Sequence, residues 1–165
     1  LVEHVAGRVR EAAGSVTLVG APERYAALGL PAIADRRPCA GPLAGIEAAL
    51  AVTSAEWNLV VACDMPSVTT DFLAALLAEA ERSSGDCLVP ATPSGRLEPL
   101  CAVYRRGCLE PFKQALDGGV RAVVEALALV RAMPRPFDND TWAVNLNDPG
   151  ELAQFLASPE ARGSR

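Results

Sequence analysis

The sequence predicts one α/β domain with three layers and a mostly parallel sheet. Short apolar and β-branched segments alternate with helical patterns, which is the order expected when helices cover both faces of a parallel sheet. Residues 57–63 are apolar on both faces, as a central parallel strand should be. A length of 165 residues suits a single domain whose core needs no disulfide or metal cross-links.

Periodicity and turn residues define the elements in order. Gly14 and Gly29 end the first two helices, and Thr69 or Thr70 caps the fourth. The predicted helices cover residues 1–13, 21–28, 43–52, 71–82, 107–116, 120–128 and 148–157. The predicted strands cover residues 15–19, 31–34, 57–63, 86–90, 98–104, 129–133 and 142–146. Residues 1–157 therefore form one predicted domain, and residues 158–165 a flexible tail.

Composition and charge argue against several kinds of partner. The net charge is −5 and the Lys and Arg residues are scattered, so no nucleic-acid partner is expected. No apolar run approaches the ~20 residues that span a bilayer, so no membrane partner is expected. The five cysteines form no C-x-x-C pair and the one histidine is His4, which argues against a zinc site of ordinary spacing. An odd number of cysteines favours reduced thiols and a cytoplasmic location.

The cysteines and the histidine are expected to be structural. Cys63, Cys87 and Cys101 lie inside apolar runs, which is typical of small core residues. His4 lies on the opening amphipathic helix and is poorly placed for general-base chemistry. The sequence contains neither a catalytic triad nor a Walker-type phosphate loop.

Two glycine-containing loops follow predicted strands, where ligands of open parallel sheets bind. Gly20 follows the 15–19 strand and allows a ligand to approach the backbone, although a plain turn is equally compatible. The loop from Asp35 to Gly45 runs into a helix N-terminus, whose free amides suit an anion or a polar base edge. Glycine and proline also commonly precede helices that bind no ligand, so the loop from Asp35 to Gly45 is weak evidence on its own.

Polar side chains also follow the central and the last predicted strands. Asp64 comes directly after the apolar strand, where a carboxylate is costly unless it has a partner. A magnesium ion shared with phosphate oxygens would be one partner, and the alternative is a turn or N-cap aspartate. Asn145 and Asn147 lie on one side of the last strand, where they either reach a ligand or the metal shell, or help to cap the final helix.

Four motifs in order resemble the molybdenum cofactor guanylyltransferases, the MobA-type enzymes. The motifs are GPLAGI at 41–46, ACDMP at 62–66, EPLCAVY at 98–104 and VNLNDPGEL at 144–152. The opening residues 1–5, LVEHV, are similar to the first helix of that family. The resemblance implies a Rossmann-like nucleotidyltransferase fold. It also implies a cytoplasmic enzyme that transfers GMP from GTP to molybdenum-molybdopterin, forming the guanine dinucleotide cofactor and pyrophosphate.

The resemblance assigns roles to residues and implies partners. Asp64 corresponds to the catalytic magnesium ligand beside the GTP phosphates. The residues implied to contact or wall the nucleotide are Gly20, Asp35, Gly41, Pro42, Leu43 and Gly45. The residues implied to line the pterin cleft are Arg96, Glu98, Arg121, Asn145 and Asn147. The implied protein partners are the molybdenum insertase and the recipient molybdoenzymes.

The sequence departs from the family pattern at its start. The family opens with a strand and a loop of the form L-x-G-G-x-S-x-R-M-G-x-x-K, and this chain has neither. We therefore expect this first strand and its glycine-rich loop to precede Leu1 in a longer protein. Three hypotheses follow: a guanylyltransferase, favoured by Cys63 before Asp64; a cytidylyltransferase or other nucleotidyltransferase on the same scaffold; or a non-catalytic nucleotide-binding homologue without the phosphate loop.

Overall fold

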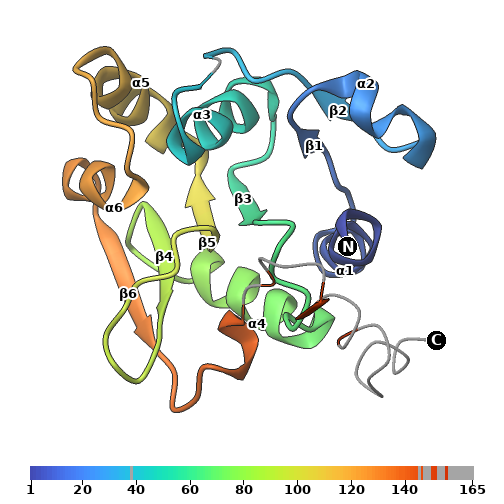
Figure 1. The fold of residues 1–165 in the computed structure, drawn as a ribbon. Helices are drawn as coiled ribbons and strands as arrows, with labels where there is room; N and C mark the ends of the chain where they lie inside the picture. Colours follow the sequence, from blue (N-terminus) through green and yellow to red (C-terminus); the bar gives the residue numbers. More distant parts are fainter. Residues whose placement is uncertain (38, 145, 147–149, 152–154, 156–165) are drawn as a thin grey trace.

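The computed structural model describes residues 1–37, 39–144, 146, 150, 151 and 155, and Figure 1 shows their arrangement. The α-helices are α1 (Val2–Ala13), α2 (Pro22–Tyr25), α3 (Pro42–Val52), α4 (Thr70–Glu81), α5 (Leu109–Asp117) and α6 (Val123–Ala126). Short 3-10 helices are η1 (Ala26–Leu28), η2 (Arg106–Cys108), η3 (Leu127–Leu129) and η4 (Thr141–Ala143). The strands are β1 (Leu18–Val19), β2 (Ala32–Ile33), β3 (Trp57–Val61), β4 (Cys87–Ala91), β5 (Cys101–Arg105) and β6 (Ala132–Pro136).

Four of the strands form one sheet in the order β3-β5-β4-β6. Strand β5 pairs antiparallel with both β3 and β4, whereas β4 and β6 are parallel. Strands β3, β4 and β6 therefore share one direction and β5 opposes them, which confirms an α/β fold with a mostly parallel sheet. Strands β1 and β2 form a separate parallel pair of two residues each.

Helices cover both faces of the four-stranded sheet, which confirms the three layers (Figure 1). On one face, Val89, Ala102 and Tyr104 pack against α3, α5 and α6. On the other face, Leu88 and Val103 pack against α4. The side chains alternate because neighbouring residues of a strand point to opposite faces. Helix α1 packs in turn against α4.

Several predicted elements are shorter or differently built. The strands expected at 15–19 and 31–34 reduce to β1 and β2. The helices expected at 21–28, 107–116 and 120–128 each consist partly of 3-10 turns. Thr69 caps α4, because its side chain accepts a hydrogen bond from the Phe72 amide at 3.2 Å.

The strand expected at 142–146 is wrong in the part that the structure describes. Trp142 lies in η4, not in a strand, because its ring stacks on Phe72 at 5.1 Å and its Nε1 donates to the Asn139 carbonyl at 2.9 Å. In the final predicted helix, Gly150, Glu151 and Phe155 are helical. The rest of that helix and the 158–165 tail lie outside the described residues. Of the helices within the described part of the chain, none has the length and apolar character needed to cross a membrane.

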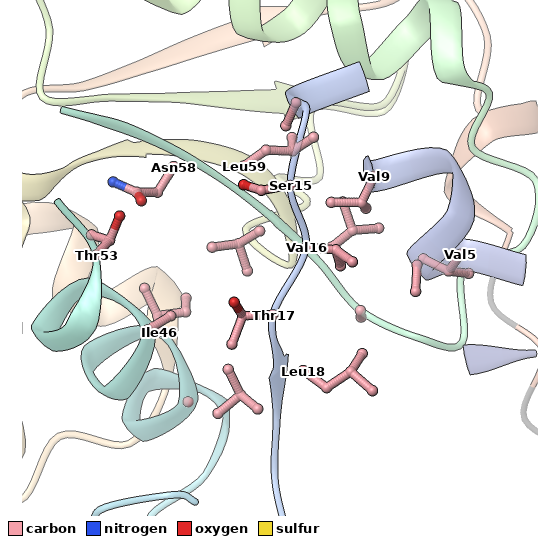
Figure 2. A pocket seen from close by; sticks show the side chains of 18 of the residues that line it. Val5, Val9, Ser15, Val16, Thr17, Leu18, Ile46, Thr53, Asn58 and Leu59 are labelled. Carbon is pink, nitrogen blue, oxygen red and sulfur yellow. The ribbon is translucent and has the colours of Figure 1, made fainter. Parts of the chain in front are cut away.

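An apolar slot of about 880 Å³ separates the β1–β2 pair from the larger sheet. Figure 2 shows side chains from α1, the 15–18 segment, α3 and β3 converging on it. Within the described residues, β1 pairs only with β2 and β3 only with β5. Strand β3 is half-buried because its second edge borders the slot. Both of its faces are covered as expected, since Val60 and Leu59 pack against apolar clusters on opposite sides of the sheet.

Candidate functional site

Asp64 lies in a tightly anchored turn after β3. The Ala62 amide donates a hydrogen bond to the Leu100 carbonyl at 2.7 Å, and the Met65 amide donates one to the Ala62 carbonyl at 3.3 Å. Met65 is buried after the turn, so the loop is held by core packing. The carbonyl of Asp64 accepts from the Leu146 amide at 2.8 Å. Leu146 therefore lies beside Asp64.

One face of α1 holds this loop in place. His4, Arg8 and Glu11 are spaced so that they share a helix face. His4 Nε2 lies 3.2 Å from the Pro66 carbonyl, and Arg8 Nη1 donates to the Val68 carbonyl. Glu11 accepts from the Thr70 hydroxyl at 2.9 Å. Sequence reasoning expected a structural His4 but did not identify this contact between α1 and the Asp64 loop.

The neutral form of His4 suits its hydrogen bond to the Pro66 carbonyl. Burial lowers the pKa of His4 and the charge of Arg8 lowers it further, while the hydrogen bond to Pro66 opposes them. The neutral imidazole therefore predominates and donates through Nε2. Protonation would place a second cation beside the guanidinium of Arg8.

The Asp64 carboxylate fits a magnesium ion. Its Oδ1 atom is buried and has no hydrogen-bond partner, and a buried carboxylate oxygen needs one. Magnesium characteristically binds one or two carboxylates and completes its shell with water and substrate phosphates. No group of three or more Asp, Glu, His or Cys side chains that could hold a metal occurs among the described residues. A shell completed by phosphates is consistent with that donor set.

Two glycines flank residues that line the slot, since Gly20 follows Val19 and Gly41 precedes Pro42. Gly20 has φ of +148°, and its amide donates to the Ile33 carbonyl at 2.9 Å. A Cβ at this position would lie 3.0 Å from the Tyr25 ring. Gly41 caps α3 with φ of +78°, and a Cβ there would lie 3.3 Å from the Arg121 carbonyl. Both positions therefore require glycine for backbone reasons.

The loop between β2 and α3 is tied down by charged side chains. Asp35 Oδ1 accepts from the Arg37 amide at 2.9 Å, which closes a local turn. Arg36 Nη1 lies 3.2 Å from Glu47 Oε1. Glu47 is only 2% exposed on α3, and its Oε2 atom has no hydrogen-bond partner. We did not predict this ion pair, although an acidic residue inside an apolar helix was a usable signal.

The remaining nucleotide-loop residues divide between the slot and the core. Pro42 and Gly45 line the slot together with Asp64, so the structure brings these three predicted residues around one cavity. Gly45 also allows α3 to pack against β1, since a Cβ there would lie 3.8 Å from Val19. The Leu43 side chain is fully buried in the core, which leaves only its backbone to face a ligand.

The predicted pterin-cleft residues lie in two places. Arg96 Nη2 lies 2.7 Å from Glu98 Oε1, and Glu98 is 8% exposed. Burial raises the pKa of Glu98, the Arg96 cation opposes this, and the charge of Asp64 adds to it. Arg121 instead packs beside Gly41, and its Nη1 donates to the carbonyls of Leu116 and Val120.

The remaining predictions concern Asn145, Asn147 and the cysteines. Asn145 and Asn147 lie outside the described residues, on either side of Leu146. Cys87 and Cys101 are buried as predicted, but Cys63 is exposed, because β3 ends at Val61 and the chain turns there.

Comparison with known proteins identifies the same family throughout. A family model described as MobA-like NTP transferase domain matches residues 1–132. A protein of Pelotomaculum thermopropionicum named "Probable molybdenum cofactor guanylyltransferase" is 30% identical, over 97% of this chain and 80% of its own length. The molybdenum cofactor guanylyltransferase of Shewanella woodyi is 33% identical, over 84% and 71% of the two chains.

Solved structures show the same fold. Molybdopterin-guanine dinucleotide biosynthesis protein A of Archaeoglobus fulgidus superposes with a TM-score of 0.74 at 24% identity, covering 92% of this chain and 82% of that one. The 2-C-methyl-D-erythritol 4-phosphate cytidylyltransferase of Thermus thermophilus superposes with a TM-score of 0.71 at 21% identity, covering 94% and 86%. Both scaffolds share the Rossmann-like arrangement, which confirms the predicted fold class.

Proposed function

Because the chain belongs to the family of MobA-like NTP transferase domains, we propose that it transfers GMP from GTP to molybdenum-molybdopterin. The products are the guanine dinucleotide form of the cofactor and pyrophosphate. The names of the relatives support the substrate pair. The observation that carries the chemistry is the buried, unpartnered Oδ1 of Asp64 at the mouth of the slot.

The reaction joins two anions, so the site must offset charge and align the reactants. The terminal phosphate oxygen of the pterin substrate forms a bond to the α-phosphorus of GTP, and the bond from that phosphorus to the β-phosphate oxygen breaks. When bound at Asp64, Mg²⁺ supplies charge neutralisation for the phosphates. No covalent intermediate with the protein is needed, because positioning and electrostatics carry the rate gain.

The two sides of the slot have separate tasks in this proposal. The backbone around Gly20 and the first turn of α3 face the nucleotide, with Gly41 allowing the close approach. Leu43 contributes its backbone because its side chain is buried. Asp35 is the side chain that we assign to the nucleotide on this side. The pterin substrate then approaches from the side of Arg96 and Glu98, and we also assign Asn145 and Asn147 to it.

The slot supports a second part of the proposal, that a strand with a glycine-rich loop and a lysine precedes Leu1. The edges of β1 and β3 both face the slot, and its walls are largely apolar. A single inserted strand would pair with both edges and join the six described strands into one sheet. Residues 1–157 would then be the larger part of one domain.

The cellular setting is also proposed. We assign the chain to the cytoplasm, with the molybdenum insertase and recipient molybdoenzymes as protein partners. The five free cysteines are consistent with a reducing compartment.

A pyrophosphate-release assay with GTP and CTP tests the function. The assay uses the protein expressed with the reading frame upstream of Leu1. We expect faster turnover with GTP, and an Asp64→Asn variant that loses about 10²–10³-fold in rate while it folds normally. Faster turnover with CTP would identify a cytidylyltransferase. An upstream frame without glycine-rich loop and lysine would leave a non-catalytic nucleotide-binding protein.

A further inference from the structure

A second carboxylate, that of Glu98, lies at the same end of the sheet as Asp64. Strands β3 and β5 pair Trp57 with Arg105 and Val61 with Cys101. The same register continues through the hydrogen bond from the Ala62 amide to the Leu100 carbonyl. Asp64 lies in the turn three residues after β3 and Glu98 lies three residues before β5, so both carboxylates are at the end of the sheet where Val61 pairs with Cys101.

Both carboxylates carry a buried oxygen atom without a hydrogen bond. These atoms are Asp64 Oδ1 and Glu98 Oε1. Arg96 Nη2 approaches Glu98 Oε1 at 2.7 Å, which makes an ion pair but not a hydrogen bond of acceptable angle. The Arg96 side chain is 60% exposed, so it is a solvent-facing counterion for a carboxylate that is itself buried. Glu98 thus keeps a buried carboxylate oxygen without a hydrogen bond, which is the kind of atom that can coordinate a small cation.

We infer that Glu98 is a second carboxylate ligand of the divalent cation held by Asp64. This inference rests on the proposed function, which places the cation at Asp64. Two carboxylates match the charge of a dication and the number of carboxylates that Mg²⁺ commonly takes from a protein. A cation between the Asp64 and Glu98 carboxylates also reduces the repulsion between these two negative groups, which are partly shielded from water. The phosphates and water then need to supply only the remaining positions.

A simpler reading makes Glu98 only the partner of Arg96. The two readings predict different effects of three variants on metal binding. If Glu98 is a ligand, Glu98→Gln weakens binding, whereas Arg96→Gln leaves it unchanged or strengthens it. If Glu98 only forms the ion pair with Arg96, neither variant changes metal binding. Glu47→Gln is the matched control, because Glu47 is also buried, also has one unpartnered oxygen and pairs with an exposed arginine elsewhere.

Titration calorimetry with Mn²⁺, used as the probe cation without nucleotide, measures this directly. We expect Glu98→Gln and Asp64→Asn each to raise the Mn²⁺ dissociation constant by about 10-fold or more, and Glu47→Gln to leave it unchanged. The rise in melting temperature on adding Mn²⁺ should shrink in the same two variants, and a cooperative melt without Mn²⁺ shows that they remain folded.

The results of the Mn²⁺ titrations distinguish a failure of the role inferred for Glu98 from a failure of the proposed function. Binding that depends on Asp64 but is unaffected by Glu98→Gln overturns the role of Glu98 and leaves the metal at Asp64. Binding that is insensitive to both variants overturns the inference and removes the metal site from the proposed function. Reduced binding in Glu47→Gln as well would show a general effect of buried charge and would also overturn it.

Discussion

The two strand assemblies on either side of the slot are built in different ways. Strands β4 and β5 are almost entirely buried, pair on both sides and carry helices on both faces. Strands β1 and β2 have two half-buried residues each and pair only with one another within the described residues. Asp64 follows the half-buried β3, but the buried Met65 and Val68 after it hold its side of the site by core packing. The Gly20 and Gly41 side is held mainly by local backbone geometry.

This difference matters for a phosphoryl-transfer site. A metal-binding carboxylate must be fixed to within a fraction of an ångström, which a packed sheet provides. A nucleotide-binding loop gains from being less stable, since binding energy can then order it. The following predictions test whether the two sides are indeed so different.

The largest expected contrast is in stability. Phe112 is fully buried and meets the Tyr104 ring edge-on at 5.7 Å, so Phe112→Ala should cost about 3–5 kcal/mol of unfolding free energy. Leu18→Ala in half-buried β1 should cost about 1 kcal/mol, because part of its surface is already in water. Urea denaturation of both variants measures the difference. Equal costs would mean that the β1–β2 pair is as integral to the core as β5.

The second contrast isolates the contact at Gly41. Gly41→Ala places a Cβ at positive φ and 3.3 Å from the Arg121 carbonyl, so we expect a cost of about 1–2 kcal/mol plus weaker GTP binding. Gly95→Ala is the control, because Gly95 has a similar φ of +83° and no atom within 4 Å of the added Cβ. It should lose less stability and leave GTP affinity unchanged. Thermal melts and nucleotide titration report the two effects, and identical behaviour of the variants would show that the Arg121 contact is immaterial.

Much of the fold was predictable because its signals are local. Helical periodicity gave α1, α3 and α4 within a few residues, and the apolar runs gave β3 and β4. The reversed direction of β5 left no trace in the sequence, since an apolar run reads the same in either direction. Trp142 was assigned to a strand because its burial against Phe72 and Phe137 is a tertiary contact.

The site was predictable to the same extent. Asp64 was identified because a carboxylate after an apolar strand is locally anomalous. The position of Glu98 at the same end of the sheet depends on the antiparallel pairing of β3 with β5, which no single segment encodes. The ion pair between Arg36 and Glu47 likewise joins two segments that only the fold brings together. Pairwise geometry therefore had to come from the structure.

The smallest expected effect is a pH dependence confined to the α1 contact with the Asp64 loop. The pKa of His4 is lower in the folded protein than its ordinary value, chiefly through burial. The unfolded chain therefore binds a proton more readily than the folded one, so the stability from neutral His4 is present at pH 7 and declines as the pH falls through ~6.5 and below. Unfolding free energies measured from pH 7.5 to pH 5 should show this shallow decline.

A His4→Gln variant provides the control for that decline. Glutamine keeps a donor that can reach the Pro66 carbonyl but does not titrate, so the slope over this pH range should flatten. Asp86 should not contribute, because the Arg131 guanidinium and amide hold its pKa at about 2, well outside the range. A slope that persists unchanged in His4→Gln would mean that another group titrates on folding and that the contact between α1 and the loop is not sensitive to pH.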